Sequence, residues 1–347
     1  MPNRDRADLP GSGHERLSPV IGQEDPAAAQ HADHLDSRFS VEKQLDFSEK
    51  SYSQGQLVRR RFFRHKGAMA SLLALVFVTV MAYTSIGVGP IPGWWGESYL
   101  RGAPVVDGGR PTLGLFPPSI GEHPFGQENI GKDYFALTMR GTQQSMLIAL
   151  SIGIISTLIG TLVGAIAGYY RGWVESVLMR VTDLFIVIPL IVLAAVVAKI
   201  AGGGIWALSL ALSILIWTGL ARLVRGEVLS LREREFVTAA EAIGTSSWRI
   251  IFRHILPNTI GTIIVSATLT IAGAILLETA LSFLGFGIQP PDTSLGLLIS
   301  QYQNAFITRP WLFWWPGMMI LTIAFSVNFL GDGLRDAFDP RQNRNAD

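Results

Sequence analysis

The sequence predicts an all-α polytopic membrane protein with six transmembrane helices and a cytoplasmic helix-turn-helix loop. Of its 347 residues, 49% are hydrophobic and 16% are charged, whereas soluble domains carry about 25% charged residues. Six stretches are long and apolar enough to cross the bilayer, which takes about 20 residues of helix with every backbone group bonded internally. Lys and Arg gather in alternate connections between these stretches, which gives the chain an orientation.

The chain begins with a polar segment, residues 1–56, that is rich in Asp, Glu, Arg, Ser and Pro. It lacks the short apolar stretch of a cleavable secretion signal. Because it has few large apolar side chains to offset the entropy of ordering, we predict a disordered or loosely ordered tail. Residues 57–340 are predicted to form the membrane domain, and residues 341–347 a second short tail.

Six apolar stretches define the predicted spans. They are residues 68–88, 145–170, 177–198, 205–220, 259–277 and 311–330. The third contains Asp183 near its start. Burying a carboxylate in hydrocarbon is costly, so we expect Asp183 to pair with Arg180 at the membrane boundary.

Basic residues are concentrated on one side of these spans. That side holds Arg59, Arg60, Arg61, Arg64, Lys66, Arg171, Arg180, Arg222, Arg225, Arg232, Arg234, Arg249, Arg253, Arg335, Arg341 and Arg344. Cytoplasmic loops carry the excess of Lys and Arg, so both termini are predicted to be cytoplasmic. The long connections 89–142 and 282–310 then form an external cap, with interfacial tryptophans at its edges. These are Trp94, Trp95, Trp311, Trp314 and Trp315.

Glycines recur every fourth residue in the second span, at Gly160, Gly164 and Gly168. Small residues at this spacing let two helix backbones approach closely. We therefore predict tight packing of this face against a neighbouring span or a partner subunit.

Residues 126–133 fit the start of a nucleotide-binding phosphate loop, G-x-x-x-x-G-K. However, Asp133 stands where a Ser or Thr hydroxyl should bind magnesium, and no strand precedes Gly126. We therefore predict no nucleotide site. The chain has no cysteine and a net charge of +1, which excludes thiolate metal sites and gives no support to a nucleic-acid partner. No catalytic residue, cofactor or metal site is predicted in this chain.

The loop between the fourth and fifth spans, residues 222–257, is predicted to form two short helices. Gly244 suits the left-handed residue that ends the first helix. Ser246 or Ser247 can cap the second helix, and Pro257 marks where that helix gives way to the next span. Composition alone equally allows a solvated or membrane-surface helix pair.

The second helix of the loop has an apolar side. It carries Ile250, Ile251, Ile255 and Leu256, with Arg249 and Arg253 on the other side. The pattern predicts a basic amphipathic element that projects into the cytoplasm.

This loop resembles the "EAA" loop of bacterial ABC importer permeases, whose pattern is Glu-Ala-Ala, three residues, Gly, nine residues, Ile, one residue, Leu-Pro. The matching residues are Ala239, Ala240, Gly244, Leu256 and Pro257, with all spacings kept. Thr238 replaces the glutamate and His254 the isoleucine. The resemblance implies that the loop docks into a groove on an ATPase subunit. The predicted docking residues are Ala239, Ala240, Glu241, Gly244, Ser246, Arg249, Leu256 and Pro257, and Glu241 or Glu235 would replace the missing carboxylate.

Segments 123–133, 278–292, 331–336 and 339–340 resemble the C-type subunit of the dipeptide/oligopeptide permease family. The similarity covers residues 56–340. It implies a bacterial inner-membrane importer in which this chain pairs with a homologous B-type permease. Two ATPase subunits, which bind ATP and magnesium, and an extracytoplasmic solute-binding protein complete the complex. Relatives carry dipeptides, oligopeptides, nickel chelates and other small solutes, so the cargo stays open.

Glu278 lies near the outer end of the fifth span. An ionisable residue at such a position often marks a transport path, and we name it as a candidate pathway residue. A secondary carrier or channel is the main alternative, but such carriers often show inverted repeats and buried charge pairs, and the sequence has no internal repeat. A receptor or scaffold role has only the length of the outer loops in its favour.

Overall fold

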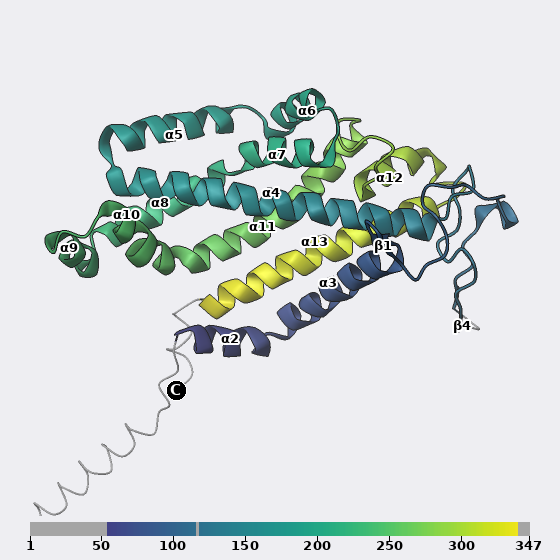
Figure 1. Ribbon diagram of the computed structural model, residues 1–347, viewed down its shortest axis with the longest axis horizontal. Coiled ribbons are helices and arrows are strands. Elements are labelled where there is room, and N and C mark those ends of the chain that lie inside the picture. The colour runs from purple at the N-terminus through teal and green to yellow at the C-terminus, as the bar shows by residue number, and fades with distance from the viewer. Residues whose placement is uncertain (1–53, 116–117, 339–347) are drawn as a thin grey trace, which may run out of the picture. The chain divides into compact units, whose positions relative to one another are not determined.

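The computed structural model describes residues 54–115 and 118–338 (Figure 1). Most of the predicted tail 1–56 and all of 341–347 lie outside the described residues. The helices are α2 (Gln54–Arg64), α3 (Lys66–Ser85), α4 (Tyr134–Tyr170), α5 (Gly172–Val187), α6 (Leu190–Ala201), α7 (Ile205–Ile216), α8 (Thr218–Arg232), α9 (Glu235–Ala242), α10 (Ser247–Ile250), α11 (Leu256–Phe283), α12 (Leu295–Tyr302) and α13 (Trp311–Phe338). Two small hairpins pair β1 (Gly87–Val88) with β2 (Ile91–Pro92) and β3 (Gly114–Leu115) with β4 (Pro118–Ser119).

The fold class is confirmed: the chain is helical and carries apolar helices of membrane-spanning length. Among the described residues, four helices are long and apolar enough to cross a bilayer by themselves, namely α3, α4, the continuous helix 247–283 and α13. Two bent pairs, α5 with α6 and α7 with α8, pass the same test together. The number of spans reaches the predicted six when each bent pair is one span.

The third predicted span, 177–198, is wrong as a single helix. α5 ends at Val187, α6 begins at Leu190, and the two axes differ by 91°. Pro189 causes the break, because it lacks an N–H group and its ring forces the residue before it out of the helical conformation. Ile188 is accordingly extended, with φ −81° and ψ 131°.

The second span begins earlier than predicted. α4 starts at Tyr134, so residues 134–142 are helical and do not belong to the external loop. The Asp133 carboxylate caps the helix by accepting a hydrogen bond from the Ala136 N–H at 2.7 Å. A run of polar residues hid this start from hydropathy, although Thr138, Gln143 and their neighbours are buried in the protein.

The predicted end of the second loop helix at Pro257 is also wrong. α10, the π turn Ile251–Ile255 and α11 form one continuous helix from Ser247 to Phe283. Pro257 lies in the first turn of α11, directly after the π turn. A missing N–H is tolerated at that position, so the proline does not stop the helix.

The glycine stripe of α4 packs against α8 within this chain. A Cβ atom would lie 2.7 Å from the Trp217 carbonyl oxygen at Gly160, 2.5 Å from the Ala221 carbonyl oxygen at Gly164, and 2.8 Å from the Val228 Cβ at Gly168. Such distances exclude any side chain. The prediction of close helix packing is confirmed, and the partner is α8.

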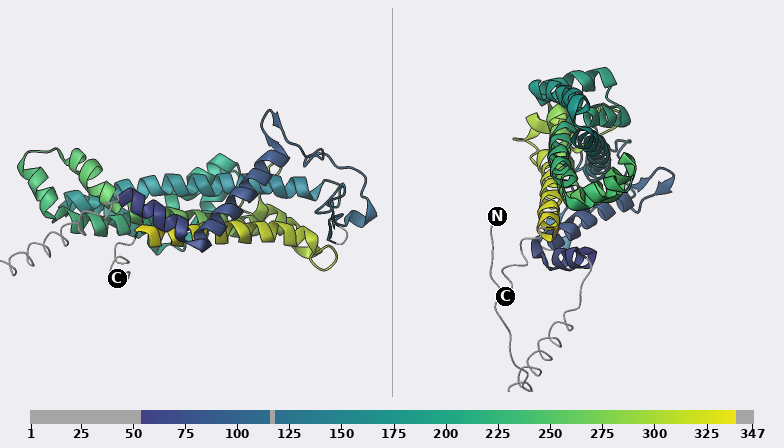
Figure 2. Two further views of the ribbon diagram at one scale, coloured as in Figure 1. Left: turned by 90° about the horizontal axis from the view of Figure 1, so that it is seen from below. Right: turned by 90° about the vertical axis from the view of Figure 1, so that its left-hand side faces the viewer.

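The helix-turn-helix and the hairpins lie at opposite ends of the helices. In Figure 1, α9 and α10 lie at the left end and β1 and β4 at the right end, and the left view of Figure 2 shows the same separation. The described part of the connection 87–133 therefore forms a cap at the far end from the loop.

Polar and aromatic contacts hold this cap together. His123 Nδ1 lies 2.8 Å from Asp133 Oδ2, and the Trp95 indole donates to Asp133 Oδ1 at 3.1 Å. Phe125 stacks on Trp315 with ring centroids 3.9 Å apart. Of the predicted interfacial tryptophans, Trp94 and Trp314 are exposed, whereas the others are packed against the cap or α13.

Candidate functional site

The turn between α9 and α10 has the geometry of a Schellman helix end. The Thr245 N–H donates to the Ala240 carbonyl at 3.1 Å, and the Gly244 N–H donates to the Glu241 carbonyl at 2.9 Å. Gly244 has a φ of +77°, which costs any residue with a Cβ atom. Nothing lies within 4 Å of the position that its Cβ would take. Glycine is therefore required by the backbone angle and not by lack of space.

The inner face of the loop belongs to a hydrophobic core. Val237 and Ala240 of α9 are buried together with Ile250, Ile251 and Ile255. They pack in one cluster with residues of α4 and α8, among them Tyr169, Val224 and Val228. The predicted apolar side of the second helix is thus confirmed, with Leu256 half-buried at its end. Because this core includes α4 and α8, the loop cannot move independently of the spans.

The outer face of the loop carries large apolar side chains that are exposed. This exposed face consists of Phe236, Ile243, Trp248 and Phe252. Ile243 is 82% exposed at the tip of the turn. The Trp248 and Phe252 rings stack with centroids 5.7 Å apart. Clustered apolar side chains on an exposed surface indicate an interaction site.

The sequence prediction missed this exposed face. The four-residue spacing of Trp248 and Phe252 places the two rings beside each other, but the same spacing rule also makes them neighbours of Ile251 and Ile255, so periodicity alone did not separate the exposed pair from the buried one. The predicted docking residues divide between the two faces. Ala239, Glu241, Gly244, Ser246, Arg249 and Pro257 are exposed, whereas Ala240 is buried and Leu256 is half-buried. The last two contribute to the support of the loop more than to its surface.

The two carboxylates considered as replacements for the missing glutamate differ in their contacts. Glu241 Oε1 accepts a hydrogen bond from the Tyr169 hydroxyl at 3.1 Å. Glu235 contributes its backbone carbonyl, which accepts from the Thr238 hydroxyl at 2.9 Å. Ser246 occupies the N-cap position of α10, but its hydroxyl makes no capping bond there.

Arginines connect the base of the loop to the neighbouring helices. Arg171 at the end of α4 pairs with Glu233 at 2.7 Å. The Arg225 Nε atom on α8 donates to Glu175 Oε1 on α5 at 2.7 Å. The Arg232 guanidinium lies over the Tyr169 ring, 5.3 Å from its centroid, in a cation–π contact. These contacts link α8 to α4 and α5 next to the turn.

The predicted pairing of Asp183 with Arg180 is wrong. Asp183 Oδ1 lies 2.5 Å from Arg222 Nη2, which is on α8. α5 and α8 pack together, so Asp183 reaches across to the facing helix and not along its own. Both side chains are about half exposed, and such pairs contribute little stability.

Glu278 is completely buried inside the chain, with an exposed fraction of 0%. Its carboxylate accepts hydrogen bonds from the Ser282 hydroxyl at 2.7 Å and from the Ser145 hydroxyl at 3.5 Å. The Ser145 oxygen in turn accepts from the Leu295 N–H at 3.1 Å. Glu278 therefore joins α4, α11 and the start of α12. A solute would reach it only if these elements separated, and its role in the path stays a prediction.

Two models of known protein families match parts of this sequence. A family model described as "Binding-protein-dependent transport system inner membrane component" matches residues 160–344. A second model, "N-terminal TM domain of oligopeptide transport permease C", matches residues 53–91. The first covers more than half of the chain. The chain belongs to the binding-protein-dependent transport permeases.

Named relatives agree with this assignment. The chain is 43% identical to the oligopeptide transport system permease protein OppC of Mycobacterium tuberculosis over 290 residues, which cover 83% of this chain and 95% of that protein. It is 35% identical to OppC of Haemophilus influenzae over 305 residues, covering 87% and 94%. A solved structure of the MetNI methionine ABC transporter aligns with a TM-score of 0.49 and 18% identity, covering 58% of this chain and 96% of that one.

The permease is a multi-pass subunit of an ABC importer, which works with separate ATPase and membrane subunits. Within the described residues no cluster of His, Asp or Glu side chains could hold a metal ion.

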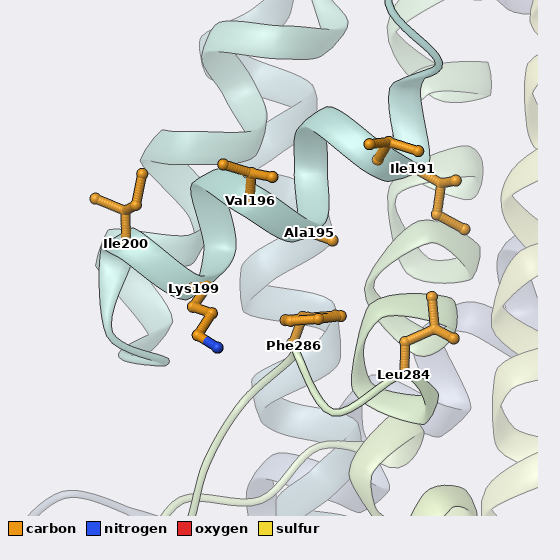
Figure 3. Close-up of a pocket in the computed structure, with 8 residues that line it drawn as sticks. Ile191, Ala195, Val196, Lys199, Ile200, Leu284 and Phe286 are labelled. Atoms are coloured by element: carbon orange, nitrogen blue, oxygen red, sulfur yellow. The ribbon is translucent and has the colours of Figure 1, made fainter.

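The permease also has an apolar pocket between α6 and the turn after α11 (Figure 3). Its volume is about 660 Å³. The walls are Ile191, Val192, Ala195, Val196, Ile200, Leu284 and Phe286. Lys199 is the charged residue of the lining and sits at the edge of the cavity. One side of this pocket is formed by α6, which the break at Pro189 turns away from the axis of α5.

Proposed function

We propose that this permease imports dipeptides or oligopeptides and that the α9–α10 loop transmits the work of separate ATPase chains to its spans. The observation that carries the proposal is the two-sided loop: the exposed face of Phe236, Ile243, Trp248 and Phe252 lies directly above core residues shared with α4 and α8. One side fits a partner groove, and the other side is fixed to the spans.

The connection from the loop to the bilayer runs through rigid elements. α9 follows α8, and α10 continues without a break into α11. A displacement of the exposed face by an ATPase therefore tilts α8 and α11 together, which is the kind of motion that opens a path alternately to each side. ATP and magnesium act on the partner chains in this scheme, and this chain supplies the path and the coupling.

The proposed complex contains a homologous B-type permease, two ATPase subunits and an extracytoplasmic solute-binding protein. α5 and α6 support a membrane partner, since both expose large apolar side chains. Leu184, Val187 and Ile200 are among its most exposed side chains. The match to a family of inner-membrane components supports a bacterial inner-membrane location, and the placement of basic residues supports an orientation with both termini and the α9–α10 loop in the cytoplasm.

Co-purification of the ATPase tests the docking surface. Ile243→Asp and Trp248→Asp put a charge into the proposed apolar contact, and we expect each to reduce ATPase retention by at least about tenfold, since one desolvated charge costs more than 1.4 kcal/mol. Ile307→Asp changes an equally exposed isoleucine in the loop before α13 and should retain the ATPase. Undiminished retention by both loop variants would refute the docking role.

Uptake by the complete complex in vesicles tests the cargo. Labelled di- and oligopeptides should accumulate only with ATP on the side of the ATPases. Accumulation of a nickel chelate or another small solute without peptide uptake would make this chain a permease of the same family with a different cargo. Gradient-driven uptake by the purified chain alone would support the secondary carrier instead.

A further inference from the structure

The short helix α2 stands apart from the span that follows it. α2 ends at Arg64 and α3 begins at Lys66. His65 between them has extended backbone angles, and its Nδ1 accepts a hydrogen bond from the Ala68 N–H at 2.9 Å, which caps α3. α2 packs beside the C-terminal end of α13 (Figures 1 and 2). A separate helix one residue away from a membrane span lies within reach of the lipid headgroups.

The end of α2 carries dense positive charge. Five of the eight residues 59–66 are Arg or Lys, and the sequence has no Asp or Glu from residue 54 to residue 96. Arg59, Arg64 and Lys66 are exposed. From α13, Asp336 approaches this region, and its Oδ2 lies 3.5 Å from His65 Nε2. Arg59, Arg64 and Lys66 thus present three exposed cations next to the start of α3.

Aromatic side chains accompany the cations. Phe62 and Phe63 make an edge-to-face contact with ring centroids 5.8 Å apart, and Phe63 is 57% exposed. At 100° per residue, Arg60, Arg61 and Arg64 share one sector of α2, and Arg59 lies between Phe62 and Phe63 on the rest of the circumference. A helix with a basic sector and exposed aromatic rings is typical of one that lies in the membrane interface.

We propose that α2 binds anionic phospholipid headgroups beside the start of α3, with Arg59, Arg64 and Lys66 at the phosphates and Phe63 inserted among the acyl chains. Clusters of four to eight Lys and Arg next to a span attract anionic lipids, with each cation strengthening the attraction about fivefold. An acidic protein segment would match the charge, but it would not provide an apolar layer for Phe63. The bilayer provides both.

A fluorophore on α2 tests this in the full-length chain. The sequence contains no cysteine, so Phe63→Cys gives a single labelling site for an environment-sensitive dye. In nanodiscs, we expect phosphatidylglycerol added to phosphatidylcholine to shift the dye emission to the blue and to protect it from acrylamide. Arg59→Gln/Arg64→Gln/Lys66→Gln in the same background should raise the phosphatidylglycerol fraction that gives the same emission shift at least about fivefold.

Two further variants serve as controls. Arg59→Lys/Arg64→Lys keeps the charge and should respond as the parent does. Arg335→Gln removes an exposed cation from the nearby end of α13 and should leave the response unchanged.

Three results would overturn the proposal. The first is equal protection of the dye from acrylamide in discs with and without phosphatidylglycerol, which would mean that α2 contacts the bilayer through apolar side chains without binding anionic headgroups. The second is an unchanged response in the triple glutamine variant. The third is protection in lipid-free detergent that disappears in Glu42→Gln/Asp46→Asn/Glu49→Gln, which would assign α2 to the polar tail. The measurement needs no ATPase or peptide, so its result is independent of the proposed import function.

Discussion

At the scale of single residues, Gly244 is the position at which the backbone angle alone disfavours any side chain with a Cβ atom. Alanine at φ +77° costs about 1 kcal/mol or more, although no neighbour crowds the site. We expect Gly244→Ala to weaken the coupling of ATP hydrolysis to uptake, and Gly244→Asn to do so less, since asparagine tolerates the left-handed region. Gly226→Ala, at an uncrowded helical glycine of α8, is the matched control. Equal loss from the alanine and asparagine variants would contradict this explanation.

Glu128 makes the stability of the cap depend on pH. Burial raises the pKa of its carboxyl above the ordinary value of 4.5, and the Lys132 ammonium, which lowers it, opposes that effect. The folded state binds the Glu128 proton more tightly than the unfolded state does, so the protonated carboxyl stabilises the fold. This stabilisation is complete below pH 4.5 and is lost as the pH rises through the raised pKa of Glu128. Glu128→Gln should flatten this part of the pH profile of thermal unfolding and stabilise the chain at alkaline pH.

The exposed carboxylate of Glu122 on the same cap provides the comparison for Glu128. Glu122→Gln should keep the parent profile. A profile that Glu128→Gln leaves unchanged would mean that another group sets the pH dependence.

The structural role of Glu278 and its proposed role in transport can be separated by substitution. Glu278→Leu leaves the hydroxyls of Ser145 and Ser282 without their acceptor, and each unpaired buried group costs about 1–3 kcal/mol. Glu278→Gln keeps an acceptor of the same size. If the charge serves the transport path, the glutamine variant should assemble normally with lower peptide uptake. Normal uptake with normal assembly would leave Glu278 a structural role only.

At the scale of elements, the contact between α4 and α8 is set by absent side chains. A Cβ at Gly164 would lie 2.5 Å from the Ala221 carbonyl oxygen, so Gly164→Ala must push the two helices apart. Overpacking of this kind costs about 1–3 kcal/mol, and we expect a lower unfolding temperature of the purified chain. Gly273→Ala in α11 meets nothing within 4 Å and should not lower it. Equal effects of the two would exclude packing as the cause.

Sequence patterns predicted those elements whose cause is local. The glycine stripe, the left-handed end at Gly244 and the apolar side of Ile250, Ile251 and Ile255 depend on backbone geometry or on periodicity, and both can be read from one segment. The 91° bend at Pro189 was missed because average hydropathy does not register a lost N–H. The partner of Asp183 was missed because it lies on a different helix, 39 residues away.

The exposed face of the loop could not be predicted from periodicity either. Periodicity identifies which residues are buried, but it does not distinguish an aromatic pair such as Trp248 and Phe252 that faces solvent from one that faces a neighbouring helix. That distinction needs the packing of α9 and α10 on α4 and α8. The spacing of the resembling motif therefore pointed to the loop, and the structure shows which of the loop's apolar side chains are exposed.

At the scale of the whole molecule, coupling requires that the loop and the cap lie on opposite sides of the membrane. The helices long enough to span the membrane lie along the direction that joins these two ends (Figure 1). Thr245→Cys labels the turn, and Ile307→Cys labels the loop before α13; neither competes with another cysteine, because the sequence has none. In intact cells, a membrane-impermeant maleimide should label Ile307→Cys and spare Thr245→Cys. Inverted vesicles should give the reverse, and labelling of the turn from outside would leave the loop without access to ATP and end the coupling proposal.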